Sequence, residues 1–145
     1  PVNATAIGGL IRCHVVSGKL DEARAQLAAT QTELLDHADV SGAKAALELA
    51  EETEKTGENN DLGALQSTLQ KTPNNHQARY DLACALWANT QREQAMDELL
   101  EIVRLEPKWN DAAARKQLLK YFEALGLTDP LTVEARGRLS SLLFN

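Results

Sequence analysis

The residues best suited to chemistry are two cysteines and three histidines, and their spacing argues against a shared site. Cys13 and Cys84 are too few for a disulfide framework or a zinc knuckle. A histidine follows Cys13 directly, and on a helix two adjacent side chains point about 100° apart, which disfavours a common metal. His14, His37 and His76 fall on different predicted helices or turns, whereas a metal site needs several converging ligands. The sequence therefore predicts no metal and no other cofactor.

A Ser-Gly-Lys-Leu stretch at residues 17–20 has some of the features of a phosphate-binding loop. Such a loop needs a glycine-rich backbone and a hydroxyl residue after the lysine. Here Cys13 stands at the position of the first glycine and Leu20 at that of the hydroxyl. No Ser, His and Asp order and no paired-carboxylate context stands out in the sequence. We therefore expect a protein that is not an enzyme.

One face of the predicted helix 76–88 carries a strip of apolar groups. Tyr80, Cys84 and Trp87 recur at i, i+4 and i+7, so they share a face of that helix. We predict that the strip faces an inner groove and holds an extended client segment or a partner helix. The alternative is that the seventh or eighth helix covers the strip and makes it core. Nothing in the neighbouring sequence predicts a lowered thiol pKa at Cys84.

The carboxy-terminal helix is the second candidate surface. Leu139, Leu142 and Leu143 belong to its apolar stripe, and Phe144 follows them directly. End helices of solenoids usually keep a polar outer face, so this concentration of apolar residues predicts a docking site for a larger protein. Burial of the stripe in a partner's groove would contribute about 25 cal/mol per Å². The alternative is that these residues pack on the seventh helix.

Recognition of a partner's terminal carboxylate is not expected. Such a site needs several charged or amide donors along one inner face. The corresponding positions here are Tyr80, Ala83 and Cys84 on one predicted helix and Gly8 and Arg12 on another. A single arginine does not make that site.

The elements that must position these residues are helices. Alanine (22 residues) and leucine (23) outnumber isoleucine plus valine (9) among the 145 residues. This balance favours helix, because β-branched side chains lose more rotamer freedom there. Helical spacing of apolar residues, together with caps and glycines, predicts eight helices, at residues 5–16, 20–35, 43–55, 62–71, 76–88, 91–106, 110–125 and 130–144. No alternating strand pattern competes, so the predicted class is all-α.

Charge is concentrated in one segment. The net charge is −6, and residues 36–62 hold eight acidic residues against two lysines. Nucleic-acid binding needs clustered Lys and Arg, so no nucleic-acid partner is expected. No run reaches the roughly 20 apolar residues of a membrane span, and residues 1–10 lack the basic and apolar regions of a signal peptide. We therefore predict no membrane association, and the low cysteine count favours a reducing compartment.

A repeat organises the predicted helices. Pro73 and Pro107 lie 34 residues apart, the period of tetratricopeptide repeats (TPRs). Leu82 and Ala83 then fall at the large and small positions through which paired helices approach closely. The chain therefore resembles the TPR family, which implies a right-handed superhelix of about eight antiparallel helices forming a single domain over residues 1–145. Its expected parts are a first repeat at 4–37, a degenerate hairpin at 38–73, a second clear repeat at 76–109 and a carboxy-terminal hairpin at 110–145. An ordinary antiparallel helical bundle is the alternative.

Several segments resemble, more specifically, the carboxy-terminal TPR region of YbbN-type thioredoxin-like proteins, also called chaperedoxins. They are HQARYDLA (76–83), WNDAAARK (109–116), FEALG (122–126), DPL (129–131) and RLSSLLF (138–144). The resemblance implies a cytoplasmic co-chaperone that holds unfolded clients and passes them to a DnaK-type chaperone or a chaperonin. The thioredoxin domain of that family, with its Cys-x-x-Cys motif, is missing from this sequence.

Two other functions stay open beside that one. In the first, the domain positions substrates for a thioredoxin-type oxidoreductase whose chemistry lies in another domain. In the second, it is a scaffold that mediates only self-association, and the protein is a homo-oligomer.

Overall fold

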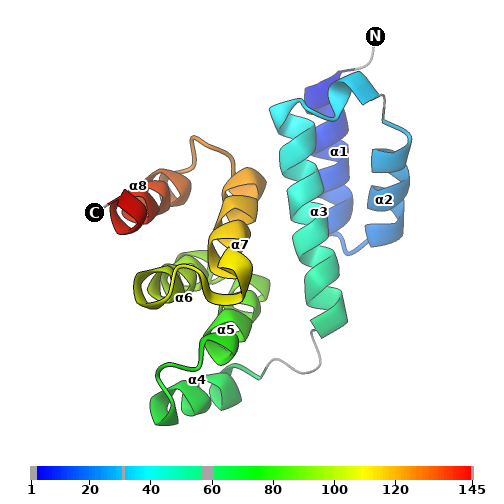
Figure 1. The fold of residues 1–145 in the computed structure, drawn as a ribbon. Helices are drawn as coiled ribbons and strands as arrows, with labels where there is room; N and C mark the ends of the chain where they lie inside the picture. Colours follow the sequence, from blue (N-terminus) through cyan, green and yellow to red (C-terminus); the bar gives the residue numbers. More distant parts are fainter. Residues whose placement is uncertain (1–2, 31, 57–60, 145) are drawn as a thin grey trace.

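The computed structural model describes residues 3–30, 32–56 and 61–144. Over these ranges the chain forms eight α-helices and one short 3₁₀ turn, with no strand (Figure 1). The α-helices are α1 Ala4–Val16, α2 Leu20–Ala28, α3 Ala38–Thr56, α4 Leu62–Lys71, α5 His76–Ala88, α6 Arg92–Leu105, α7 Trp109–Leu125 and α8 Pro130–Phe144. The all-α prediction is confirmed, and α4 and α5 have the predicted bounds.

Short polar side chains begin four of the helices. Asn3, Asp61, Asn75 and Asp129 each accept a hydrogen bond from a backbone N–H two or three residues further on, at 2.9–3.0 Å. This is the N-cap arrangement, which satisfies donors that the helix itself leaves unpaired. Gly126 ends α7 with φ +96°, a conformation that residues with a Cβ rarely adopt. These local signals explain why the predicted boundaries of α4, α5 and α8 agree with the structure.

The second helix is shorter than predicted. It ends at Ala28, and a 3₁₀ turn at Thr32–Leu34 replaces the last part of the expected helix. The hydroxyl of Thr30 donates to the carbonyl of Gln26 at 2.8 Å. The backbone N–H of Thr30 donates to the carbonyl of Leu27 at 3.1 Å, three residues back, so the regular i to i−4 pattern ends here.

The third helix begins five residues earlier than predicted, because Gly42 is a packing residue rather than a boundary. A Cβ added at Gly42 would lie 2.8 Å from the carbonyl oxygen of Glu123 and 2.6 Å from Nη2 of Arg12. Glycine therefore lets α3 approach α7 closely while the Arg12 side chain passes between them. The predicted helix began at residue 43, directly after Gly42, because a close approach between helices leaves no local signal in the sequence.

The start of α7 also differs from the prediction. Asn110, Asp111 and Ala112 have left-handed backbone conformations, with φ of 46°, 60° and 61°. The regular right-handed helix thus begins after Ala112, three residues later than the predicted start at residue 110. Asparagine and aspartate are the residues other than glycine that visit this region most readily.

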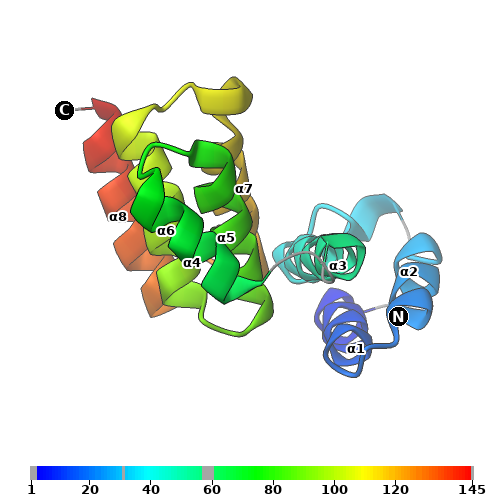
Figure 2. The same cartoon turned by 90° about the horizontal axis from the view of Figure 1, so that it is seen from below.

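The helices bury two apolar clusters, and α3 contributes to both. The smaller cluster joins α1, α2 and α3 through Ile11, Ala23, Ala43 and Leu47. The larger one is built mainly from α5 to α8 and includes Leu49 of α3. Figure 2 shows α3 on the side of the α1–α3 group that faces α5 and α7. The long third helix therefore holds the two parts of the molecule together.

Successive helices pack in the manner of a TPR-like superhelix, with one irregular region. The pairs α1 with α2 and α5 with α6 pack against each other. In the segment 38–73, predicted as a degenerate hairpin, α3 packs on α1 and α7 whereas α4 packs on α5. The division into repeats stays a prediction.

Candidate protein-binding site

The apolar strip of α5 lies beside α3 and α7. Tyr80, Cys84 and Trp87 all line one cavity of about 210 Å³, which we call the α5 cavity. Leu49 of α3 and Tyr121 of α7 also line it. The opposite face of α5 is buried in the core through residues such as Leu82 and Ala85. The structure therefore brings the three predicted residues together on the face that looks toward the amino-terminal helices.

Only part of this strip is accessible. The ring of Trp87 is 8% exposed and stacks on Tyr121, with ring centroids 3.9 Å apart and an interplanar angle of 8°. Tyr80 and Cys84 are half-buried, and the Tyr80 ring packs against Trp109 at 5.8 Å. Trp87 thus belongs to the core beneath the cavity, where α7 covers it, as the alternative prediction stated. Tyr80 and Cys84 form the accessible wall of the cavity.

The cavity is acidic at its polar edge. Glu52 of α3 and Asp81 of α5 both line it. Burial, together with the negative charges of Glu52 and Asp81, raises the pKa of the Cys84 thiol to about 12. A thiol with this pKa is protonated at neutral pH and is a poor nucleophile. Cys84 is therefore a soft apolar contact, and Cys13, which is exposed, is the more accessible thiol.

Polar contacts fix α3 against α7 at one side of the cavity. Glu52 accepts hydrogen bonds from Nε2 of Gln117 at 3.2 Å and from Nζ of Lys120 at 3.0 Å. Lys120 also lies 3.5 Å from Glu48. These contacts join residues more than sixty positions apart, so they set the width of the space between α3 and α7.

The carboxy-terminal residues differ sharply in burial. Leu139 is 6% exposed and belongs to the larger core cluster, on which Leu142 and Leu143 pack while half-buried. Phe144 is 80% exposed. Leu139 is thus a core residue. The alternative expectation placed this stripe on the seventh helix, whereas α8 packs mainly on α6 and only slightly on α7. Phe144 is the predicted residue on this helix that is fully available to a partner. An open groove of about 890 Å³ lies alongside, between α6 and α8.

A third hollow, which we call the arginine cleft because Arg12 and Arg92 line it, was not predicted from the sequence. It has a volume of about 640 Å³ and lies between the carboxy-terminal part of α1, the middle of α3 and the turn from α5 to α6. Arg12 and Arg92 both line it, as do the apolar side chains of Val16 and Leu20. The sequence pattern places a single arginine on the inner face, because nothing in it brings Arg92 beside Arg12.

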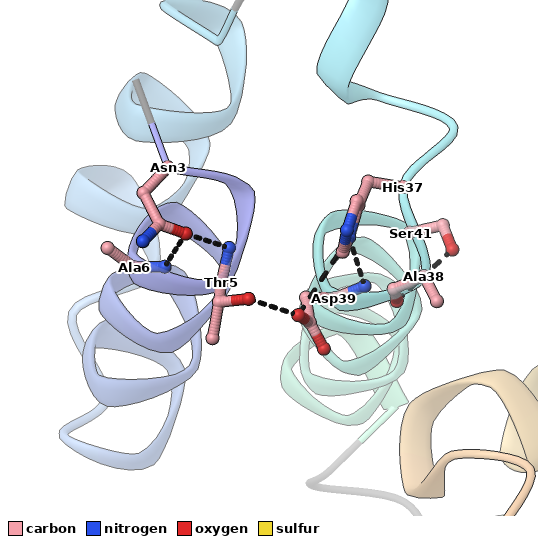
Figure 3. Close-up of polar contacts among 7 residues, drawn as sticks. All are labelled: Asn3, Thr5, Ala6, His37, Ala38, Asp39 and Ser41. Atoms are coloured by element: carbon pink, nitrogen blue, oxygen red, sulfur yellow. Dashed lines mark hydrogen bonds and ion pairs between the residues drawn. The ribbon is translucent and has the colours of Figure 1, made fainter. Parts of the chain in front are cut away.

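A polar cluster joins the amino-terminal ends of α1 and α3 (Figure 3). The hydroxyl of Thr5 donates to Oδ2 of Asp39 at 2.7 Å, and Nδ1 of His37 accepts from the backbone N–H of Asp39 at 3.2 Å. Although the residue types match a hydrolase triad, the hydroxyl points to the carboxylate rather than to the imidazole. The cluster therefore has the geometry of a structural tie between two helix ends.

The part of the chain that the structure describes holds no group of three or more residues placed to bind a metal ion. No helix in the described ranges combines the length and the apolar character needed to cross a bilayer.

Comparison with known families agrees with the fold. The tetratricopeptide repeat family matches residues 55–144, which is more than half of the chain. The chain belongs to this family, whose domains generally mediate contacts between proteins. Searches of curated proteins and of solved structures returned no match.

Proposed function

We propose that this TPR domain is the partner-binding part of a thioredoxin-like co-chaperone, which holds unfolded clients. The observation that carries the proposal is the accessible apolar wall of Tyr80 and Cys84 beside the cavity between α3, α5 and α7. Extended segments bind in such grooves through their side chains and need no catalytic group. The resemblance of residues 76–83 and 109–144 to chaperedoxins supports the same function, and two free cysteines accord with a cytoplasmic site of action.

A light-scattering assay tests the holding activity. We expect the chain alone, without reductant, to suppress the aggregation of heat-unfolded citrate synthase at a low molar excess. A requirement for the cysteines of a separate thioredoxin domain would instead favour the accessory role in an oxidoreductase. Aggregation that is unchanged at any excess would contradict the proposal.

Site-specific photo-crosslinking tests where the client binds. A photoreactive phenylalanine analogue at Tyr80 should crosslink to the unfolded client. The same analogue at Leu119 is the matched control, because Leu119 is 46% exposed on α7 and lines neither the α5 cavity nor the arginine cleft. Equal crosslinking from both positions would mean that the cavity is not the site.

The exposed end of α8 supports docking to a DnaK-type chaperone or a chaperonin as a second contact. Phe144 extends the apolar residues Leu142 and Leu143 beyond the core. The same surface is also the feature that favours self-association. A mass that rises with protein concentration in sedimentation, and that is lost in Phe144→Ala, would favour the scaffold over chaperone docking.

A further inference from the structure

The cleft between α1, α3 and the α5–α6 turn combines apolar walls with two guanidinium groups. Its volume of about 640 Å³ lies within the range of about 300–1,000 Å³ that is usual for ligand pockets. Val16, at 88% exposed, is the most exposed large apolar residue in the described part of the chain and stands at the edge of this cleft. Val16 therefore offers apolar surface that a bound segment would bury.

Arg92 is held in place but is not neutralised. Its guanidinium carbon lies 4.7 Å from the centroid of the Trp87 ring, and Trp87 is itself fixed by its stack on Tyr121. Among the residues that the structure describes, no carboxylate lies within ion-pair distance of Arg92. A stacked arginine keeps its in-plane N–H donors available for a planar acceptor.

Arg12 is the second positive group of the cleft. Its Nη1 donates to the carbonyl of Ala124 at 2.8 Å, which leaves other donors of the same guanidinium for a ligand. The pKa of Arg12 is lowered. Burial is the largest cause and the positive charge of Arg92 adds to it, while the negative charge of Asp39 acts in the opposite direction. Two like charges therefore influence each other here, although the chain as a whole carries a net charge of −6.

The acidic residue at the edge of the cleft does not neutralise this pair. Glu54 lines the cleft, but its carboxylate lies 3.5 Å from Nη2 of Arg24 on the outer side of α3. The two arginines thus make a local positive site with apolar surroundings, and its complement is a negative group carried on an apolar segment.

We propose that this cleft binds a glutamate or aspartate side chain of an extended segment in a partner protein, with an adjacent apolar side chain against Val16 and Leu20. The inference rests on the proposed protein-binding function and names the chemistry of the partner. Trp87 and Thr53 line both this cleft and the α5 cavity. The two hollows are therefore neighbours, and an extended segment bound at the arginine pair would lead toward the wall of Tyr80 and Cys84.

Fluorescence anisotropy with two synthetic peptides tests this specificity. Both are fluorescein-labelled decapeptides with an amidated carboxyl end; one alternates leucine with glutamate and the other leucine with glutamine. We expect the glutamate peptide to bind at least about tenfold more tightly, the effect of one good charge-assisted contact. Its affinity should fall as the salt concentration rises from about 0.05 to about 0.5 M, because surface charges are screened.

Substitutions locate the contact on the protein. Arg92→Gln and Arg12→Gln should each weaken binding of the glutamate peptide about tenfold or more, while Arg12→Lys, which keeps the charge, should retain most of it. Arg115→Gln is the matched control, because Arg115 is exposed on α7 away from the cleft. Unchanged thermal melting of Arg92→Gln separates a loss of binding from a loss of fold.

Two outcomes would overturn the inference: equal binding of the two peptides, or equal weakening by Arg115→Gln and Arg92→Gln. If the peptides fail while citrate synthase still crosslinks at Tyr80, only this inference is wrong and the proposed function stands. If both probes fail, the proposed function is wrong as well.

Discussion

Arg12 of α1 donates a hydrogen bond from Nη1 to the carbonyl oxygen of Ala124, 2.8 Å away at the carboxy-terminal end of α7. The last carbonyls of a helix lack partners within the helix and carry a partial negative charge. The bond joins two helices through residues that are 112 positions apart in the sequence. It therefore ties the amino-terminal helices to the carboxy-terminal ones and also forms one wall of the arginine cleft.

Removal of this tie should reduce the stability of the whole chain. We expect Arg12→Ala to lower the free energy of unfolding by about 1–2 kcal/mol, somewhat less than a fully buried charged hydrogen bond contributes. Urea denaturation measures the change, with Arg115→Ala as the control for loss of one surface arginine. Equal stability of the two variants would show that the contact with Ala124 contributes little.

Gly42 should not tolerate a methyl group. An added Cβ would come within 2.8 Å of the carbonyl oxygen of Glu123, so Gly42→Ala should cost about 1–3 kcal/mol through overpacking. Gly137→Ala on α8 provides the contrast, because nothing lies within 4 Å of its added Cβ. That variant should be more stable by about 0.5–1 kcal/mol, since alanine is the better helix residue. Thermal melting of both variants checks the prediction, and a neutral Gly42→Ala would contradict it.

The two thiols should differ in reactivity. Cys13 is exposed, whereas Cys84 is half-buried and its thiol has a pKa raised to about 12. With a disulfide reagent at pH 8 we expect one fast reaction, absent in Cys13→Ala, and a second that becomes fast only in urea. Two fast phases in the native protein would be inconsistent with the described packing of Cys84.

The same raised pKa predicts a dependence of stability on pH. The folded state keeps the Cys84 proton after the unfolded state has lost it, so the contribution is complete below about pH 9 and is lost as the pH rises toward 12. The loss attributable to Cys84 is about 1.4 kcal/mol per pH unit in that window. Urea denaturation from pH 8 to 10 should show a shallower decline for Cys84→Ala than for the original chain. Identical slopes would mean that the folded and unfolded thiols titrate alike.

The carboxy-terminal helix should divide into structural and exposed positions. Leu139→Ala removes a core side chain and should cost about 2–4 kcal/mol. Phe144→Ala changes a residue that is 80% exposed and should alter stability by less than about 0.5 kcal/mol. If Phe144→Ala also abolishes chaperone docking or self-association, the end of α8 is the contact surface. Similar losses of stability in both variants would show that Phe144 is packed in solution.

Much of the fold could be predicted because its signals are local. The N-cap at Asp61 and the turn residues around Pro73 and Asn75 determine where α4 and α5 begin and end, and the structure places these helices as predicted. The spacing of Tyr80, Cys84 and Trp87 was likewise enough to put the three on one face. Each of these inferences depends on residues within a few helical turns of one another.

The tertiary structure determined which other residues those helix faces contact. Tyr121 lies 34 positions beyond Trp87, and only the packing of α7 on α5 shows that its ring covers the tryptophan. Arg12 and Arg92 are 80 positions apart, and no periodicity connects them. Contacts between helices depend on where whole faces come together in space, so burial and the grouping of charges follow from packing. The sequence by itself determined the helices and the residues that share each face, whereas the packing decided which of those residues a partner can reach.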